Sequence, residues 1–182
     1  MAPSAWKGLQ WEVYSQQKKM VFSMDKILFE RIIVRNDRAW ICAKILINEI
    51  PLIDIVYNYE KAHISHNKNY KPSYEYDCAV ELYSQIKNAF AAKKKSKICL
   101  LVCTCMEAGC NSFKAYIHET KNSVVLSGFQ NPRFTKKKNY NDIDYTKFDK
   151  YQFDKLQFMS ELAKLKTFAP SGEYSIPWGA QE

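Results

Sequence analysis

The segment between residues 98 and 129 constrains the fold most, because it alternates in the manner of strands joined by tight turns. An apolar run, Ile98–Val102, is followed by a cysteine-rich stretch and then by the alternating segment Ser112–His118. Side chains along a strand repeat every two residues. This period places four side chains of the first strand on one face: Cys99, Leu101, Cys103 and Cys105. Gly109 supplies the backbone freedom that a turn needs, so the segment predicts an antiparallel hairpin.

The rest of the chain predicts further antiparallel strands and about three helices. Asp154, with Gln157 three residues later, has the pattern of a helix N-cap. The predicted elements are strands Ile27–Val34, Trp40–Ile47 and Val124–Phe129, and helices from Pro51 to Lys61, from Tyr76 to Ala92 and after Asp154. Because the predicted strands and helices do not alternate regularly as in βαβ units, we expect an α+β domain with a mainly antiparallel sheet and the helices packed to one side.

The 182 residues are enough for one domain with its own core. We expect a single domain over residues 1–182, with its core at about 27–166 and peripheral segments at 1–20 and 167–182. No run approaches the ~18 apolar residues of a membrane span, and residues 1–20 lack the apolar stretch of an export signal. We therefore expect a cytoplasmic protein with reduced thiols and no membrane contact.

The three closely spaced cysteines, Cys103, Cys105 and Cys110, admit packed thiols, a zinc site or a redox pair. Structural zinc uses four ligands in paired short spacings. Here the nearest imidazole, His118, lies at the far end of the next predicted strand. We therefore expect packed, reduced thiols and no metal or other cofactor. If a metal is bound, these three cysteines are its candidate ligands.

Catalysis is not expected from the motifs present. A nucleophilic cysteine needs a nearby cation or a helix N-terminus to ionise, and Cys105, the candidate partner of His118, precedes a predicted turn. The five glycines form no phosphate-binding loop. We expect a protein that acts by binding, not an enzyme.

The net charge of +8 is compatible with three interpretations: a nucleic-acid partner, an acidic protein partner, or simply a well-solvated surface. Lysine outnumbers arginine, and because base recognition prefers arginine, the balance disfavours sequence-specific DNA binding. The predicted loop between residues 131 and 149 mixes cations with aromatic rings, a combination that suits protein interfaces. The residues predicted to contact the partner are Arg133, Phe134, Lys136, Lys137, Lys138, Tyr140, Tyr145 and Tyr151.

The chain from about Trp40 to Leu165 resembles a family of small bacterial proteins that share a Cys-x-Cys-x4-Cys hairpin. The three cysteines of this chain have that spacing. The other shared motifs are Ile45-Leu46-Ile47-Asn48 followed by Leu52-Ile53-Asp54-Ile55-Val56, then Phe129-Gln130-Asn131-Pro132-Arg133, then Asp144-Tyr145 with Phe148, and finally Phe153-Asp154-Lys155-Leu156-Gln157-Phe158.

That family includes immunity proteins of contact-dependent growth inhibition systems, and the resemblance implies the same function. Such a protein binds its cognate toxin domain, for example a nuclease, and blocks the active site or an exosite. The resemblance thus implies a 1:1 complex with a toxin protein in the bacterial cytoplasm. The residues themselves leave two alternatives open: a basic RNA-associated protein, and a small zinc-binding protein that uses the cysteine hairpin.

Overall fold

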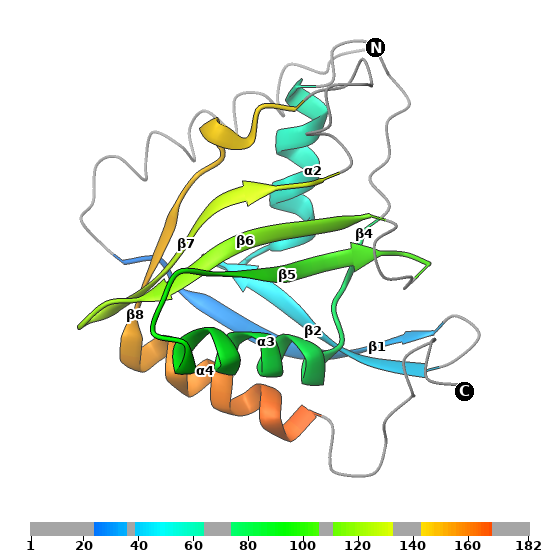
Figure 1. Cartoon of the computed structure of the whole chain (residues 1–182). Helices are drawn as coiled ribbons and strands as arrows, with labels where there is room; N and C mark the ends of the chain where they lie inside the picture. Colours follow the sequence, from blue (N-terminus) through cyan, green and yellow to red (C-terminus); the bar gives the residue numbers. More distant parts are fainter. Residues whose placement is uncertain (1–23, 36–38, 64–73, 106–110, 133–142, 169–182) are drawn as a thin grey trace, which may run out of the picture.

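A computed structural model describes residues 24–35, 39–63, 74–105, 111–132 and 143–168 of the chain (Figure 1). These residues form two antiparallel sheets together with α-helices, so the predicted α+β class is confirmed. The predicted peripheral segments, 1–20 and 167–182, lie outside the described residues except for Thr167 and Phe168.

The elements follow one another along the chain as hairpins interrupted by helices. Their bounds are β1 (Ile27–Arg35), β2 (Ala39–Ile47), β3 (Ile50–Pro51), α2 (Leu52–His63), β4 (Tyr74–Tyr76), α3 (Ala79–Ala91), β5 (Ser96–Cys103), β6 (Ser112–Glu119), β7 (Ser123–Gln130), the 3₁₀ turn η1 (Tyr145–Lys147), β8 (Tyr151–Asp154) and α4 (Lys155–Phe168). The first sheet has the order β1-β2-β3, and the second has the order β4-β5-β6-β7-β8.

Two isolated bridges join the sheets, so the strands form an almost continuous ring. Asp25 pairs with Phe153 in parallel, which connects the start of β1 to β8, and Cys42 pairs with Cys78, which connects β2 to the start of α3. The N–H of Asp25 donates to the Gln152 carbonyl at 2.8 Å, and the N–H of Gln152 donates to the Asp25 carboxylate at 2.8 Å. The first bridge is therefore held by both backbone and side-chain bonds.

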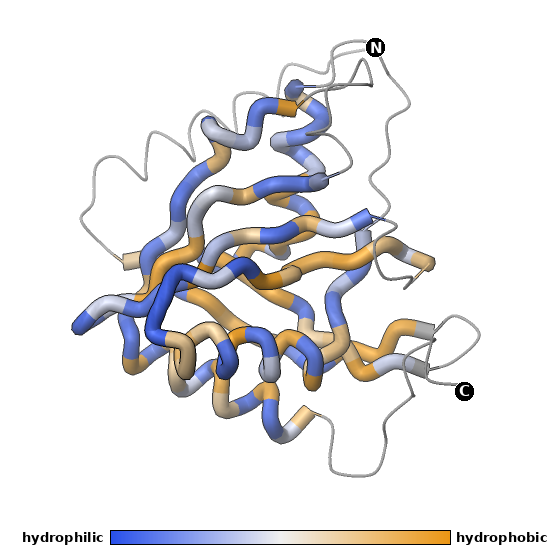
Figure 2. The backbone as a smooth tube through the Cα atoms, viewed as in Figure 1, coloured by the Kyte–Doolittle hydropathy of each residue, from blue (hydrophilic) through white to orange (hydrophobic). Residues whose placement is uncertain are grey.

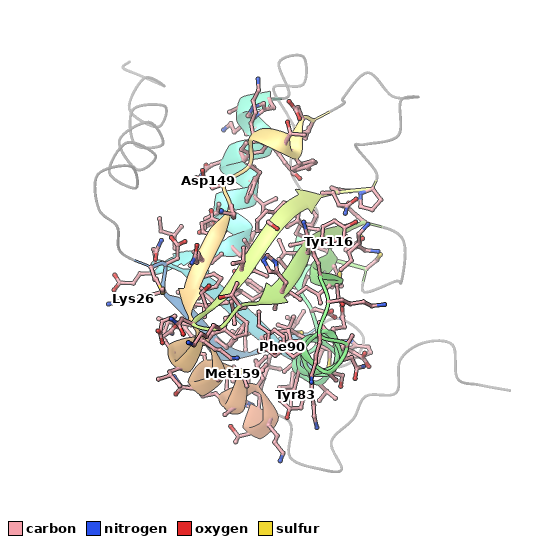
Figure 3. All side chains as sticks on the ribbon, turned by 60° about the vertical axis from the view of Figure 1, so that its left-hand side comes forward. Lys26, Tyr83, Phe90, Tyr116, Asp149 and Met159 are labelled. Atoms are coloured by element: carbon pink, nitrogen blue, oxygen red, sulfur yellow. The ribbon has the colours of Figure 1, made fainter. Side chains whose placement is uncertain are left out.

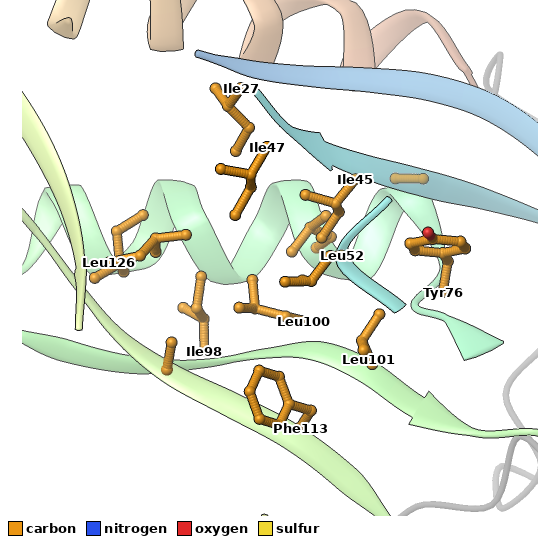
Figure 4. Packing of buried hydrophobic residues seen from close by; sticks show 14 of the residues in the cluster. Ile27, Ile45, Ile47, Leu52, Tyr76, Ile98, Leu100, Leu101, Phe113 and Leu126 are labelled. Atoms are coloured by element: carbon orange, nitrogen blue, oxygen red, sulfur yellow. The ribbon is translucent and has the colours of Figure 1, made fainter. Parts of the chain in front are cut away.

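Apolar side chains of both sheets fill the space between them (Figure 4). Ile27, Ile45 and Ile47 come from the first sheet, and Ile98 and Phe113 come from the second; none is more than 2% exposed. Burying one such side chain contributes about 1.5–3 kcal/mol, so this shared core is what holds the two sheets together.

The helices form two groups. α3 and α4 pack against each other, with the rings of Phe90 and Phe158 6.0 Å apart, and they lie below the sheets in Figure 1. α2 instead packs on β2, β3 and β4, towards the top of the same view. The α3–α4 pair covers one end of the core, and α2 covers the other.

α4 covers the free edge of β1 and satisfies part of its backbone. The N–H of Ile27 donates to Gln157 Oε1 at 3.4 Å, and Gln157 Nε2 donates back to the Ile27 carbonyl at 2.5 Å. One helical turn later, Glu161 accepts from the N–H of Phe29 at 3.2 Å, and Glu161 is only 6% exposed. Because an uncovered strand edge is a template for unwanted pairing, α4 takes the place of a further strand.

A register shift in β5 corrects the predicted face of the cysteines. Cys99 pairs with Lys114, whereas Leu101 pairs with Phe113. Neighbouring residues of β6 point to opposite faces of the sheet, and paired residues share a face. Cys99 and Leu101 therefore lie on opposite faces. The predicted common face was wrong, because a β-bulge changes the alternation between these two residues.

The predicted hairpins at residues 27–47 and 98–118 are confirmed, but two aromatic segments form strands that the sequence did not predict. Tyr76 was expected to begin a helix; it pairs instead with Leu101 in the second sheet, and the helix begins at Ala79. β8 pairs Phe153 with Val124. Both segments are too short to show a clear period in the sequence.

The predicted N-cap of the last helix is confirmed. The N–H of Gln157 donates to Asp154 Oδ1 at 2.9 Å. In a capping box the Gln157 side chain would return to the Asp154 backbone. Here that side chain bonds to Ile27, so it joins α4 to β1.

Replacing Glu161 with Ala should destabilise the protein by about 2 kcal/mol, because the buried N–H of Phe29 would lose its acceptor. Glu161→Gln keeps an oxygen at that position and should cost less. Urea denaturation at neutral pH measures both free energies of unfolding.

Lys164→Ala is the matched control, because Lys164 Nζ contacts the Glu161 carboxylate at 2.5 Å while remaining half exposed. Removing this exposed partner should cost less than about 1 kcal/mol. Equal losses in Glu161→Ala and Lys164→Ala would show that the ion pair, and not the bond to β1, carries the stability.

Candidate functional site

A concave pocket of about 480 Å³ opens between the turn after α3, the end of β6 and the turn that follows β6. Figure 2 shows both turns in the blue of hydrophilic residues, at the left of the view. The lining residues are Ala89, Lys93, Lys94, Lys95, His118, Glu119, Thr120 and Lys121. Four lysines and a histidine around one small volume create a positive potential that favours anionic ligands.

Three of these lysines come from the turn that ends α3. The N–H of Lys93 donates to the Phe90 carbonyl at 3.0 Å, and Lys93 has a left-handed φ of 49°. The chain thereby leaves the helix and enters β5 within a few residues. The negative end of the helix dipole stabilises cations at this position, which is a structural reason for Lys93, Lys94 and Lys95.

The fourth lysine, Lys121, belongs to the turn between β6 and β7, so the dipole of α3 does not explain it. Thr120 holds this turn: its Oγ1 accepts from the N–H of Ser123 at 3.0 Å, and its own N–H donates to the Ser123 carbonyl at 2.7 Å. The N–H of Lys155, at the start of α4, donates to the Asn122 carbonyl at 3.1 Å. Lys121 is therefore presented by a turn with a fixed backbone.

Tyr116, which is labelled in Figure 3, contacts two ammonium groups, one of them from the lining of the pocket. Lys95 Nζ lies 4.7 Å and Lys97 Nζ lies 5.1 Å from the centre of the Tyr116 ring, within the range of cation–π interactions. The ring also packs against Gly128, where φ is +58° and an added Cβ would lie 3.0 Å from Tyr116 Cδ2. Gly128 thus leaves room for the ring, and the ring positions both lysines.

His118 lines the pocket and also carries a buried polar atom. Its side chain is partly buried at the end of β6. The Nδ1 atom is shielded from solvent and has no hydrogen-bond partner among the described residues. Because a water-sized molecule does not reach this nitrogen, a ligand in the pocket would not contact it directly.

The structure does not bring Cys105 and His118 together. Cys105 follows the end of the hairpin at which Val102 pairs with Ser112, whereas His118 lies beyond Ile117 at the other end. At roughly 3.3 Å per residue, they are on the order of 15 Å apart or more. The one nucleophile–base pair that the sequence suggested is therefore not assembled.

Two of the predicted contact residues are core residues, which corrects the sequence-based prediction. Tyr145 is 5% exposed and Tyr151 is 0% exposed, so neither ring is accessible to a partner. The hydroxyl of Tyr145 donates to the buried carboxylate of Glu60 at 2.5 Å, which offsets the cost of burying it. The other predicted contact residues lie outside the described residues: Arg133, Phe134, Lys136, Lys137, Lys138 and Tyr140.

The cysteine pattern is only partly described. Cys103 is buried and Cys105 is exposed, while Cys110 lies outside the described residues. Within the described parts of the chain, no three side chains of the types that bind metals gather in one place. The zinc alternative therefore depends on the sequence pattern alone.

A second group of titratable side chains is buried on β2, on β5 and before α3. Burial raises the pKa of Asp77 to about 6, although the N–H of Cys78 and the side chain of Gln85 donate to its carboxylate at 2.8 and 3.1 Å. Burial also raises the pKa of the Cys42 and Cys99 thiols to about 12. Both thiols are therefore protonated at neutral pH and unsuited to nucleophilic chemistry.

Sequence reasoning placed the partner contact in the loop at 133–140 and missed the pocket. The run Lys93–Lys95 was visible, and Lys121 lay in a predicted turn between strands. What was missing was the register of β5 on β6, which pairs Ser96 with Ile117 and so brings these lysines to one end of the sheet.

Known proteins give no further guide to this site. Comparison of the chain with protein-family models, with curated proteins and with solved structures found no significant match. Among the described helices, none has the length and apolar character to cross a membrane.

The buried Asp77 should make stability depend on pH. Because the folded protein holds the Asp77 proton more tightly than the unfolded chain, protonation favours folding. This contribution is fully present below the ordinary pKa of 3.8 and is lost as the pH rises through about 6. The loss should reach roughly 3 kcal/mol.

Urea denaturation of the natural protein and of Asp77→Asn between pH 4 and pH 7.5 measures this effect. The variant cannot titrate at this position, and the other titrating groups cancel in the difference between the two proteins. The stability of the natural protein relative to the variant should fall across this range. Parallel pH profiles would show that Asp77 titrates normally in the folded protein.

Proposed function

We propose that this chain is an immunity protein that neutralises a cognate toxin domain by binding it, and that it binds through the surface around the pocket. We call this surface the basic face and define it as Lys93, Lys94, Lys95, Lys97, Tyr116 and Lys121. The observation that carries the proposal is that lysines from two separate turns line one pocket, and that one of them, Lys95, shares the Tyr116 ring with Lys97. The toxin as partner comes from the sequence resemblance.

The basic face has properties that suit a protein interface. Lys121 and Lys95 are exposed, while the turns and strands beneath them are hydrogen-bonded and fixed. A fixed surface loses little conformational entropy on binding. The Tyr116 ring contacts the ammonium groups of Lys95 and Lys97, so both cations are already positioned before a partner binds.

The charge of the chain indicates which toxin surface it meets. Inhibitors of nucleases are often acidic because they occupy a basic cleft, whereas this chain carries a net charge of +8. It should therefore bind an acidic face or an exosite of the toxin and block substrate from there. Opposite charges on the two surfaces would also speed association. We expect a 1:1 complex in the cytoplasm, where the toxin would act.

The segment at residues 133–140 remains a proposed second contact. Its cations and rings are the types of side chain that protein interfaces use: Arg133, Lys136, Lys137 and Lys138, with Phe134 and Tyr140. Tyr145 and Tyr151 are left out of this proposal because they are buried.

RNA binding is the second candidate, because the same lysines would suit a phosphate backbone. Single-stranded RNA is usually held by stacking bases on exposed aromatic rings. The Tyr116 ring is already engaged by Gly128, Lys95 and Lys97. A base would have to displace these lysines, and for this reason we favour a protein partner.

Reversing three charges on the basic face should weaken toxin binding. The variant Lys95→Glu/Lys97→Glu/Lys121→Glu should slow association at least about tenfold at low salt and flatten its salt dependence. The association rate is measured by surface plasmon resonance with the cognate toxin domain, and protection is measured as growth of cells that produce the toxin.

The matched control is Lys26→Glu/Lys61→Glu/Lys147→Glu, which changes the net charge equally at exposed lysines away from the pocket. It should protect cells nearly as well as the natural protein. If both variants lose toxin binding and protection equally, the effect comes from the net charge of the chain and not from the basic face. Loss of bound RNA with protection intact would favour the RNA alternative, and cells that survive the toxin without this protein would end the immunity proposal.

A further inference from the structure

We infer that the pocket binds the phosphate groups of a small phosphorylated molecule. This inference depends on the pocket itself and goes beyond the proposed function, because it requires no protein partner. The lining places four lysines around about 480 Å³. The one carboxylate in the lining, Glu119, already pairs with Lys155 at 3.1 Å, outside the lining residues. Glu119 therefore does not pair with the lysines that line the pocket, and their positive charge is available to a ligand.

The chemistry of the lining favours phosphate over a singly charged anion. Lysine ammonium groups are compact point charges and frequent phosphate ligands. Several of them held close together repel one another in the empty pocket, and an anion with two or more charges relieves this repulsion more than a carboxylate does. A phosphate ester or a pyrophosphate meets this requirement.

His118 lines the pocket, but its Nδ1 atom is shielded from solvent. A ligand in the pocket would therefore contact the lysines and not this nitrogen.

The size and the rigidity of the pocket also suit a small ligand. Pockets for small molecules are commonly of about 300–1,000 Å³ and are formed before the ligand arrives. The walls here are the hydrogen-bonded turn at Thr120 and Ser123 and the end of α3 at Lys93. Lys93 lies in the turn after α3 and Lys121 lies in the turn after β6, so a ligand in the pocket between these two turns would contact both lysines.

Isothermal titration calorimetry with sodium pyrophosphate tests this inference on the whole chain. We expect 1:1 binding that weakens when sodium chloride is raised from about 50 to about 200 mM, as ions screen the charges. In ¹H–¹⁵N spectra, the largest changes of amide chemical shift on adding pyrophosphate should fall on residues 93–95 and 118–121. Inorganic phosphate and ADP are titrated in parallel: tighter binding of ADP than of pyrophosphate identifies a nucleotide, and equal binding identifies the phosphate groups alone.

One variant and one control decide the outcome. Lys94→Gln/Lys121→Gln should weaken pyrophosphate binding at least about tenfold, because two of the four lysines lose their charge. Lys61→Gln/Lys147→Gln removes two exposed lysines elsewhere and should leave binding unchanged. Thermal denaturation confirms that each variant is folded.

The inference is overturned if pyrophosphate does not bind, if both double variants bind it equally, or if the shifts spread evenly over exposed lysines. The result is separate from the toxin test. Pyrophosphate binding without toxin protection would remove the proposed function and leave this inference standing, and protection without pyrophosphate binding would do the reverse.

Discussion

The bonds from α4 to the edge of β1 support much of the rest of the structure. Gln157 and Glu161 hold the helix along the strand, and Phe158, on the same helix, packs on Phe90 of α3. At its first residue, Lys155, α4 also bonds to the turn that carries Lys121. α4 thus positions both walls of the pocket: the end of α3 and the turn after β6. The geometry of the site depends on a helix that contributes none of its lining.

Much of the fold could be predicted because its hairpins are local and their alternation is regular. β1 and β2 pair along their full length, from Ile27 with Ile47 to Arg35 with Ala39, and the apolar runs of the sequence predicted this. The bulge after Cys99 was not predictable, because it depends on how β5 meets β6. β4 and β8 were missed because a segment of three or four residues has no reliable period, and only the neighbouring strand makes it a strand.

The candidate site was harder to predict, because its residues are distant in sequence and similar to ordinary surface residues. Lys93–Lys95 is explained by the end of a helix alone, and only the position of Lys121 beside it suggests a ligand. Tyr145 was assigned to the surface because tyrosines are common at interfaces. Its burial depends on Glu60, a carboxylate on α2 that is itself completely buried, and a sequence does not show this pairing.

The contact between β1 and α4 has a consequence for how the chain is made. Ile27 and Gln157, which bond to each other, are separated by 130 residues in the sequence. A ribosome adds roughly 5–20 residues per second, so the first hairpin emerges on the order of ten seconds before the helix that protects its edge. During that interval the strand edge is open to other nascent chains and to chaperones. The newly made chain is therefore most exposed to aggregation before its last helix is complete.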